Sequence, residues 1–417
     1  MKILFVHQNF PGQFLHLAPA LAARGHKVLA LTDEHNPRAS PVEVLRYRAP
    51  THTPDPTALR LARTYAKAVE RGVACARAAR SLRDKHGFMP DLILGHSGWG
   101  ETLFLRSIWP KARIVIYAEY YYRARGLDSD FDAEFLPENP DRDFAITAEQ
   151  AHLGHALAQA DAAICPTEWQ AETFPPVYRP MIHVMHDGID TARLAPDQGA
   201  QVTLPNGPTL RAGDEVLTFV NRNLEPYRGY HIFMRALPLV LAARPNAQVV
   251  IMGGDGVSYG RPAPDGRSWK DTFLIEVADR IDPARVHFTG RVPYATFAAL
   301  IQVTRVHAYL TYPFVLSWSV LEAMAAGAHV VASDTGPVRE VITQGDTGDL
   351  VGFFDVPGWA ARLTGALAHP KRHDPQRRAA RALVQARYDL HSVCLPRQIA
   401  FIEGFSPPES QGGSARP

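Results

Sequence analysis

Three charged side chains in the C-terminal half could bind a nucleotide through hydrogen bonds. Glu322 stands near the start of an apolar helical stretch, residues 320–326. A carboxylate there can accept hydrogen bonds from two vicinal hydroxyls, and ribose offers such a pair. Arg222 and Arg228 lie between an expected strand and an expected helix, and their planar guanidinium forks suit bidentate hydrogen bonding to a phosphate. The alternatives are a glutamate that only complements a helix dipole and arginines that are ordinary surface charges.

Further candidates stand where expected strands end. Gly12 and Gly254 lie in turns where the missing side chain lets a ligand approach the backbone, although any sharp turn could use a glycine. Glu119 could hydrogen-bond sugar hydroxyls or stabilise a developing positive charge, with a salt bridge as the alternative. His96 is a candidate for contact with an acceptor, meaning a substrate that receives a transferred group, or it is a plain buried histidine. The same loop holds two more acceptor-side candidates, Trp99 and Glu101.

These residues need a framework of alternating strands and helices, and that pattern occurs twice. The first series has expected strands at 2–7, 27–32, 92–95, 113–117, 160–166 and 182–185, with helices at 13–24 and 58–85. The second has expected strands at 216–220, 247–252, 286–288, 307–310 and 329–332, with helices at 230–244 and 320–326. Strand–helix alternation predicts an α/β protein with two doubly wound parallel sheets, whose ligands bind at the carboxyl edges of the strands.

The predicted division is a first domain over residues 1–195 and a second over 196–387. The polar, Pro- and Gly-bearing stretch 195–213 is expected to link them. A helix at about 388–405 is expected to pack back on the first domain. Residues 406–417, rich in Ser, Gly and Pro, are expected to be disordered.

Composition narrows the function class. The 44 basic and 42 acidic residues leave a net charge of +2, which argues against a nucleic-acid partner. The three cysteines are far apart in the sequence and form no metal-binding pattern, so we expect no metal site and a reducing compartment. No secretory signal and no apolar run of membrane-spanning length is visible, which favours a cytoplasmic protein.

The helix expected at 58–85 leaves one question of partners open. Its many Lys and Arg residues form a basic face that could rest on an anionic membrane surface. The alternative is a solvated face of a helix packed on the sheet. In the first case the protein would lie peripherally at the inner face of the membrane, and its acceptor could be lipid-linked.

The sequence resembles the family-four retaining glycosyltransferases. The most specific segment is 320–334, VLEAMAAGAHVVASD, where the family reads roughly V-L-E-A-M-A-x-G-x-P-V-V-A-S-D. The N-terminal half resembles one subgroup through HQNFPGQF at 7–14, GHSGWGE at 95–101 and EYYY at 119–122. The resemblance covers about residues 1–400. It implies the GT-B fold, in which two Rossmann-like domains face a central cleft, and transfer of a sugar from a nucleotide-diphosphate sugar with retention of configuration.

The resemblance also implies roles for the candidates. Glu322 would bind the ribose of the donor, and Arg222 and Arg228 would neutralise its diphosphate as charge builds on the leaving group. Glu119 would act near the transferred sugar. Gly12, Gly254 and Val292 are further donor-binding positions. The backbone of Val292 would contact the base of the nucleotide. The family implies neither a cofactor nor a metal.

One departure from the family concerns the sugar. The family carries a first glutamate eight positions before Glu322, and this sequence has Phe314 there. That glutamate contacts the transferred sugar in relatives, so we expect sugar recognition to differ. The nearby candidates are Ser317 and Ser319, which could supply donors, and Trp318, which could stack on a sugar face or be a core aromatic.

Two other functions remain open from the sequence. A nucleotide-sugar epimerase uses the same fold, and the missing glutamate is compatible with a non-catalytic nucleotide-sugar-binding subunit. A nicotinamide dehydrogenase is disfavoured, because no G-x-G-x-x-G follows the first strand. The acceptor could be a carbohydrate, a lipid-linked sugar or a protein.

Overall fold

The computed structural model describes residues 1–50, 60–205, 207–264 and 266–405. The chain forms two compact units, each described by itself. Unit 1 comprises residues 1–124, 139–187 and the C-terminal part from Cys394. Unit 2 comprises 125–138 and 188–393. The chain therefore leaves unit 1 at Ala124, returns to it at Asn139, and returns again near its end.

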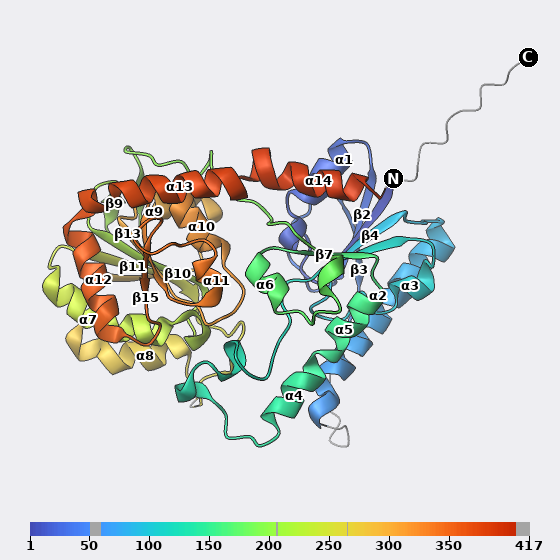
Figure 1. Cartoon of the computed structure of the whole chain (residues 1–417), viewed down its shortest axis with the longest axis horizontal. Coiled ribbons are helices and arrows are strands. Elements are labelled where there is room, and N and C mark those ends of the chain that lie inside the picture. Colours follow the sequence, from blue (N-terminus) through green and yellow to red (C-terminus); the bar gives the residue numbers. More distant parts are fainter. Residues whose placement is uncertain (51–59, 206, 265, 406–417) are drawn as a thin grey trace, which may run out of the picture. The chain divides into compact units, whose positions relative to one another are not determined.

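Unit 1 is built on a seven-stranded parallel sheet in the order β3-β2-β1-β4-β5-β6-β7 (Figure 1). The strands are β1 Lys2–Val6, β2 Lys27–Asp33, β3 Glu43–Tyr47, β4 Leu92–His96, β5 Arg113–Tyr117, β6 Ala162–Cys165 and β7 Ile182–Val184. The helices are α1 Leu17–Ala23, α2 Arg63–His86, α3 Leu105–Ile108, α4 Arg142–Glu149, α5 Ala151–Ala158, α6 Glu168–Glu172 and α14 Leu395–Glu403.

Strand β1 shows why the sheet is buried on both faces. Leu4 and Val6 point into one apolar cluster, whereas Ile3 and Phe5 point into another. Side chains alternate across a strand, so a continuous apolar run supplies both faces at once. Helices α2 and α3 contribute to the first cluster, and α1 and α14 contribute to the second.

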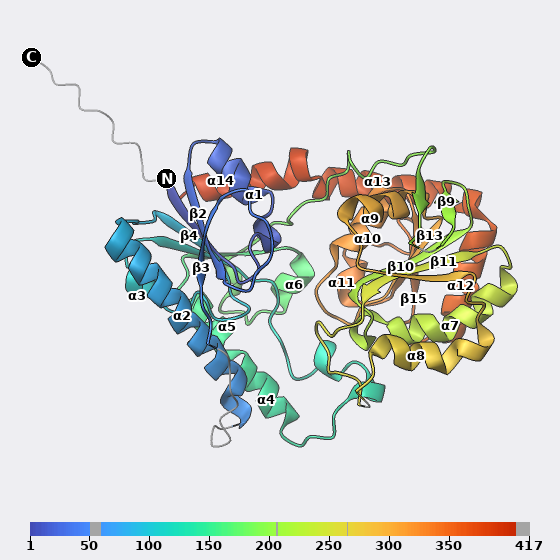
Figure 2. The same cartoon turned by 180° about the vertical axis from the view of Figure 1, so that it is seen from behind.

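Unit 2 repeats the plan with a six-stranded parallel sheet in the order β12-β11-β10-β13-β14-β15 (Figure 2). The strands are β10 Val216–Asn223, β11 Gln248–Gly254, β12 Val286–Gly290, β13 Val306–Tyr309, β14 His329–Ser333 and β15 Asp349–Val351. The helices are α7 Tyr230–Ala243, α8 Trp269–Val277, α9 Tyr294–Val303, α10 Trp318–Ala325, α11 Gly336–Arg339, α12 Val356–Ala368 and α13 Asp374–Tyr388. Helices α9 and α10 cover one face of the sheet, and α7 and α8 cover the other.

Both sheets share the order of a dinucleotide-binding doubly wound fold, in which the first strand lies centrally and the order reverses beside it. The predicted α/β class with two Rossmann-like units is confirmed. Strands β3 and β15 were not expected from the sequence. The stretch 195–213 is more than a linker, because it contains a hairpin of β8 (Gln201–Thr203) and β9 (Thr209–Arg211) whose Val202 and Leu210 are buried in the core of unit 2.

The C-terminal helix α14 belongs to unit 1. Ile402 is buried in the same cluster as Ile3 and Phe5, and Glu403 accepts hydrogen bonds from Arg24 at 2.6 Å and is bonded to His26 at 3.1 Å. The tail expected to be disordered, residues 406–417, lies outside the described residues.

Helix α2 buries Cys75, Ala79 and Leu82 against the sheet of unit 1. The exposed cations of this helix include Lys67, Arg77, Arg80 and Lys85. In the part of the chain that the structure describes, no helix is both long enough and apolar enough to cross a membrane.

Candidate functional site

The candidate donor residues of unit 2 gather at one edge of its sheet. Arg222 lies near the end of β10, Gly254 ends β11, Val292 follows β12, and Glu322 belongs to the helix after β13. The strands are parallel, so their carboxyl ends meet at this edge, which is where ligands bind in open α/β sheets.

Glu322 is a buried carboxylate with one hydrogen-bond partner among the described residues. It is 8% exposed, and its Oε1 accepts a hydrogen bond of 2.9 Å from the hydroxyl of Tyr294. Burial raises its pKa to about 7, against a smaller lowering by the Tyr294 bond. Helix α10 begins at Trp318, with Ser317 as its N-cap, so Glu322 lies in the second turn and not at the helix start. Glu322 is therefore not explained as a residue that only complements the helix dipole, because the interaction of a charge with the dipole fades beyond the first turn.

Arg228 is buried and holds two loops together. Its Nη1 donates to Thr311 Oγ1 at 2.7 Å and to the carbonyl of Val315 at 2.9 Å. Its guanidinium lies over the rings of Tyr259 and Phe314, at 5.1 and 5.7 Å from their centroids. The interpretation of Arg228 as an ordinary surface charge is therefore wrong.

Arg222, in contrast, is exposed at the end of β10. Close to it, Asn223 accepts a hydrogen bond from Arg291 at 3.0 Å and donates one to Ser258 at 2.7 Å. A side chain at Gly254 would force this pair to move, because a Cβ would stand 2.6 Å from Asn223 Oδ1 and 3.0 Å from Arg291 Nε. The glycine therefore makes room for this polar pair.

The carboxylate of Glu225 fixes the neighbouring loop. It is fully buried and accepts hydrogen bonds from the backbone N–H groups of Ser258, Tyr259 and Gly260, between 3.0 and 3.3 Å. The loop after β10 and the loop after β11 are thereby locked to one another. Nothing in its sequence context marked Glu225, since its partners lie more than thirty residues away.

The segment before α10 shows what replaces the expected glutamate. Phe314 is buried, with its ring 5.0 Å from that of Tyr259 and 5.5 Å from that of Tyr227. Ser317 accepts a hydrogen bond from the backbone of Ser319 at 3.3 Å, and its own N–H donates to the hydroxyl of Tyr309. Trp318 is 38% exposed, so its interpretation as a core aromatic is wrong.

Val292 is half-buried, and its side chain packs against the core of unit 2. This packing explains why the residue is apolar. A role of Val292 in binding a base would have to come from its backbone groups.

Unit 1 places a chain of four polar side chains at the carboxyl edge of its sheet. His7 Nε2 lies 2.8 Å from Gln13 Oε1, and Gln13 Nε2 donates to Glu119 Oε1 at 2.9 Å. The other carboxylate oxygen, Oε2, lies 3.6 Å from Nε2 of His96. His96 is buried, and its Nε2 has no hydrogen-bond partner among the described residues. Glu119 is therefore flanked on both sides, while its side chain stays 31% exposed.

Gly12 makes this chain possible. It has a φ of +49°, and a Cβ there would stand 2.5 Å from Nε2 of His7. A side chain at this position would displace the imidazole that bonds Gln13. Burial and the nearby His96 lower the pKa of His7 well below its usual value, so the ring is neutral.

The acceptor-side candidates separate into two groups. The ring of Trp99 stacks on His96 with centroids 4.5 Å apart, and it is half-buried. Glu101 is fully buried and accepts a hydrogen bond of 2.7 Å from Tyr47, with Arg71 at 3.7 Å. Burial raises the pKa of Glu101. The structure thus brings Trp99 together with His96 and Glu119, and it gives Glu101 an internal role.

Several residues of these sites were missed from the sequence. Tyr294, Asn223 and Glu225 carry no motif of their own, and each is identified only by a contact across the fold. Gln13 was missed as well. Gln13 had a signal, because it belongs to the segment 7–14 that carried the resemblance.

Within the described residues, two groups of histidine and acidic side chains come close enough to be considered for a metal. One is Asp132, Glu134 and His231, but Glu134 is paired with Arg235, and Asp132 accepts the hydroxyl of Tyr312 at 2.6 Å.

The other group is His329, Asp349 and His373. The two rings lie with centroids only 3.9 Å apart at 31°, and Arg362 lies 3.8 Å from Asp349. Nε2 of His329 lies 3.0 Å from Oδ2 of Asp349. In both groups the carboxylates thus have protein partners.

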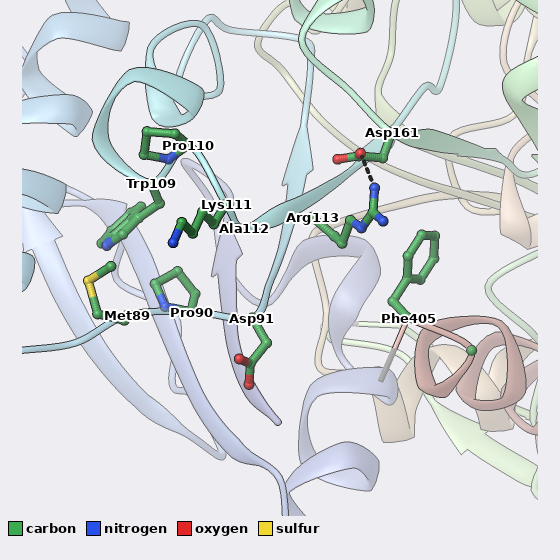
Figure 3. Close-up of a pocket in the computed structure, with 11 residues that line it drawn as sticks. Met89, Pro90, Asp91, Trp109, Pro110, Lys111, Ala112, Arg113, Asp161 and Phe405 are labelled. Atoms are coloured by element: carbon green, nitrogen blue, oxygen red, sulfur yellow. Dashed lines mark hydrogen bonds and ion pairs between the residues drawn. The ribbon is translucent and has the colours of Figure 1, made fainter. Parts of the chain in front are cut away.

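A cavity of about 930 Å³ in unit 1 lies away from these sites (Figure 3). Asp91 and Asp161 precede β4 and β6, and Arg113 begins β5, so the cavity lies at the amino-terminal edge of the sheet. Arg113 and Asp161 pair at 2.9 Å on its wall. The candidate residues lie at the opposite, carboxyl edge.

Comparisons with known families match both halves of the chain. The model described as "Glycosyl transferase family 4 group" matches residues 24–194. The model described as "Glycosyl transferases group 1" matches residues 203–383.

Curated relatives match over shorter stretches. The D-inositol 3-phosphate glycosyltransferase of Mycobacterium marinum is 29% identical over 213 residues, which is 50% of this chain and 42% of that protein. The phosphatidyl-myo-inositol mannosyltransferase of Mycolicibacterium smegmatis is 35% identical over 162 residues, 38% of this chain and 37% of that protein. The matches thus span about half or less of the length of these relatives.

Solved structures match over nearly the whole chain. Sucrose-phosphate synthase from Thermosynechococcus elongatus gives a TM-score of 0.67 at 19% identity, covering 97% of this chain and 99% of that one. Anabaena HepE in complex with UDP-glucose gives 0.64 at 16% identity, covering 97% and 99%. At these identities the likeness establishes the fold, two Rossmann-like domains of the GT-B type.

Proposed function

We propose that this chain, which belongs to the GT-B glycosyltransferases of the family-four type, moves a sugar from a nucleotide-diphosphate sugar to an acceptor hydroxyl with retention of configuration. The observation that carries the proposal is the buried carboxylate of Glu322, at the carboxyl edge of the unit 2 sheet. In the part of the chain that the structure describes, only the hydroxyl of Tyr294 is hydrogen-bonded to it. We assign the chain to the subgroup marked by the segment 7–14.

The donor side of the proposal rests on unit 2. Two ribose hydroxyls donating to Glu322 would supply the hydrogen bonds that its ionised form needs in a buried place. The exposed guanidinium of Arg222 is the proposed partner of the diphosphate, and Arg228 supports it by holding the loop through Thr311 and Val315. Arginine charge at this point would stabilise the diphosphate as it leaves.

The chemistry of the transfer follows from the leaving group. As the bond from the anomeric carbon to the diphosphate oxygen breaks, the acceptor oxygen bonds to the same face of that carbon. The proton of the acceptor passes to the departing diphosphate oxygen, so no separate protein base is required. The Glu119 carboxylate, held by Gln13 and flanked by His96, would stabilise the positive charge on the sugar.

Two alternatives make different products. An epimerase would change the donor sugar without an acceptor, and a binding subunit would bind donor and change nothing. The ordered polar chain around Glu119 favours an enzyme over a subunit, because a binding module has no need to orient a carboxylate in unit 1.

The first experiment is binding of UDP, GDP, ADP and dTDP by calorimetry. One of these is expected to bind with a dissociation constant in the micromolar range, and Arg222→Ala is expected to weaken it about tenfold through loss of a charged hydrogen bond. The matched control is Arg211→Ala, an exposed arginine of the hairpin. If none of the four diphosphates binds, the proposal fails. The anomeric configuration of the product, read by NMR, then separates retention from inversion.

The acceptor and the location are a further part of the proposal. We propose a cytoplasmic protein whose exposed cations on α2, among them Lys67, Arg77 and Arg80, touch an anionic membrane surface when the acceptor is lipid-linked. The protein is expected to co-sediment with phosphatidylglycerol vesicles at low salt and to be released by 0.5 M salt, with phosphatidylcholine vesicles as the control. Equal recovery with both kinds of vesicle would remove the membrane surface from the proposal.

A further inference from the structure

Residues 125–138, here called the strap, come from the first half of the chain but pack into unit 2. Two aromatic side chains anchor it. The ring of Phe131 lies 5.1 to 5.2 Å from those of Tyr312, Phe353 and Phe354. Phe135 lies at similar distances from His231 and Trp269. Both rings are half-buried, and their contacts with these aromatic neighbours attach the strap to unit 2.

Two buried carboxylates of the strap each receive a tyrosine hydroxyl. Tyr227 donates to Asp128 at 2.7 Å, and Tyr312 donates to Asp132 at 2.6 Å. Asp132 is also paired with His231 at 3.1 Å. Hydrogen bonds to an ionised acceptor are short and strong, and the loss of one partner leaves a buried group unsatisfied.

These tyrosines belong to the two loops that carry the proposed donor site. Tyr227 and Tyr312 pack with centroids 4.7 Å apart, and the N–H of Tyr312 donates to the carbonyl of Tyr227 at 3.0 Å. Tyr227 directly precedes Arg228, the side chain that binds Thr311 and Val315. The strap thus contacts Tyr227 and Tyr312, and these two tyrosines belong to the loops of the proposed donor site.

We propose that the strap is part of the donor site, with Asp128 as a positioning residue that fixes the loop at 221–229 through Tyr227. Residues 188–393 then do not form a self-sufficient nucleotide-binding module, because the first half of the chain supplies the groups that order their loops. This inference rests on the proposed function for the identity of the ligand, but the ordering of the loop stands on geometry alone.

The alternative is a strap that only stabilises the fold. Glu134 of the same strap separates the two, since both oxygens of its carboxylate accept hydrogen bonds from Arg235, at 2.6 and 2.7 Å, rather than from Tyr227 or Tyr312. A strap that only stabilises predicts that loss of Glu134 and loss of Asp128 lower the melting temperature and affect the loop alike.

The test compares Asp128→Ala, Tyr227→Phe, their double variant and Glu134→Ala in the full chain. Amide hydrogen exchange of the peptide 221–229, measured without ligand, is expected to accelerate several-fold in Asp128→Ala and Tyr227→Phe and to stay unchanged in Glu134→Ala. The dissociation constant of the tightest of UDP, GDP, ADP and dTDP is expected to rise about tenfold in the first two variants. The double variant is expected to match the single variants, because both remove one bond.

The inference is overturned if Asp128→Ala exchanges in this peptide like the unmodified protein, or if Glu134→Ala accelerates it equally. Should no diphosphate bind to the unmodified protein, the proposed function fails, and the exchange of 221–229 alone decides the role of Asp128.

Discussion

Replacing Glu322 with glutamine is expected to make the protein more stable at pH 8 while weakening its grip on nucleotide. Burial raises the pKa of this carboxyl from 4.5 to about 7. A group whose pKa is raised on folding contributes stability that is complete below pH 4.5 and is lost as the pH rises through 7. Above that pH the buried carboxylate is ionised, which lowers the free energy of unfolding of the unmodified protein. Glutamine removes this destabilisation, which amounts to up to roughly 3 kcal/mol.

The measurement is urea unfolding of both proteins at pH 6 and pH 8. The gain in the free energy of unfolding is expected to be clearly larger at pH 8 than at pH 6. Glu43→Gln, an exposed carboxyl on β3, serves as the matched control and is expected to give no such difference. A gain independent of pH would contradict the assignment of this pKa to Glu322.

The same substitution is expected to weaken binding of the nucleoside diphosphate about tenfold or more, because two ribose hydroxyls lose a charged acceptor. For the unmodified protein, affinity is expected to increase from pH 6 to pH 8 as Glu322 ionises. For Glu322→Gln, the contribution of Glu322 to this pH dependence should vanish, and only that of the ligand's terminal phosphate, whose second pKa is about 6, should remain. Equal affinity of the two proteins at pH 8 would remove the ribose role of Glu322.

Glu119→Gln is expected to lower kcat by about a hundredfold to a thousandfold, the usual effect of losing one charge-stabilising group. The amide oxygen can still accept from Gln13, so the geometry is kept and only the charge is lost. Binding of the free nucleoside diphosphate is expected to stay within about twofold, because the proposed diphosphate and ribose contacts belong to unit 2.

The control for this experiment is Glu168→Gln, an exposed glutamate on α6 of unit 1. It is expected to leave kcat unchanged. If Glu119→Gln retains more than a third of the activity, the carboxylate does not stabilise charge on the sugar.

The sequence was most informative where local pattern and tertiary burial agree. The segment 320–334 predicted a helix followed by a buried strand, and α10 and β14 are there. It was least informative where short elements are held by distant partners. Strand β3 has an exposed or half-buried pattern over most of its length, and β15 is only three residues long and begins with a buried aspartate. Neither has an apolar run that could be recognised.

The candidate site divides along the same line. Glu322 and Gly12 could be chosen from sequence, because each lies in a recognisable segment. Tyr294 could not, since it reaches Glu322 from a helix 28 residues earlier in the chain. The burial of Arg228 also lay beyond the sequence, because its partners Thr311 and Val315 are more than eighty residues away.

The return of the chain to unit 1 through α14 has a consequence for synthesis on the ribosome. Ile402 completes the cluster that contains Ile3 and Phe5, so the sheet that is made first needs a helix that is made almost 400 residues later. Domains generally fold as they emerge, from the N-terminus onward. Here the first domain to emerge keeps an apolar face uncovered until α14 has been synthesised, which makes the nascent first half a client for chaperones and makes loss of α14 costly for a domain formed mainly by the N-terminal half.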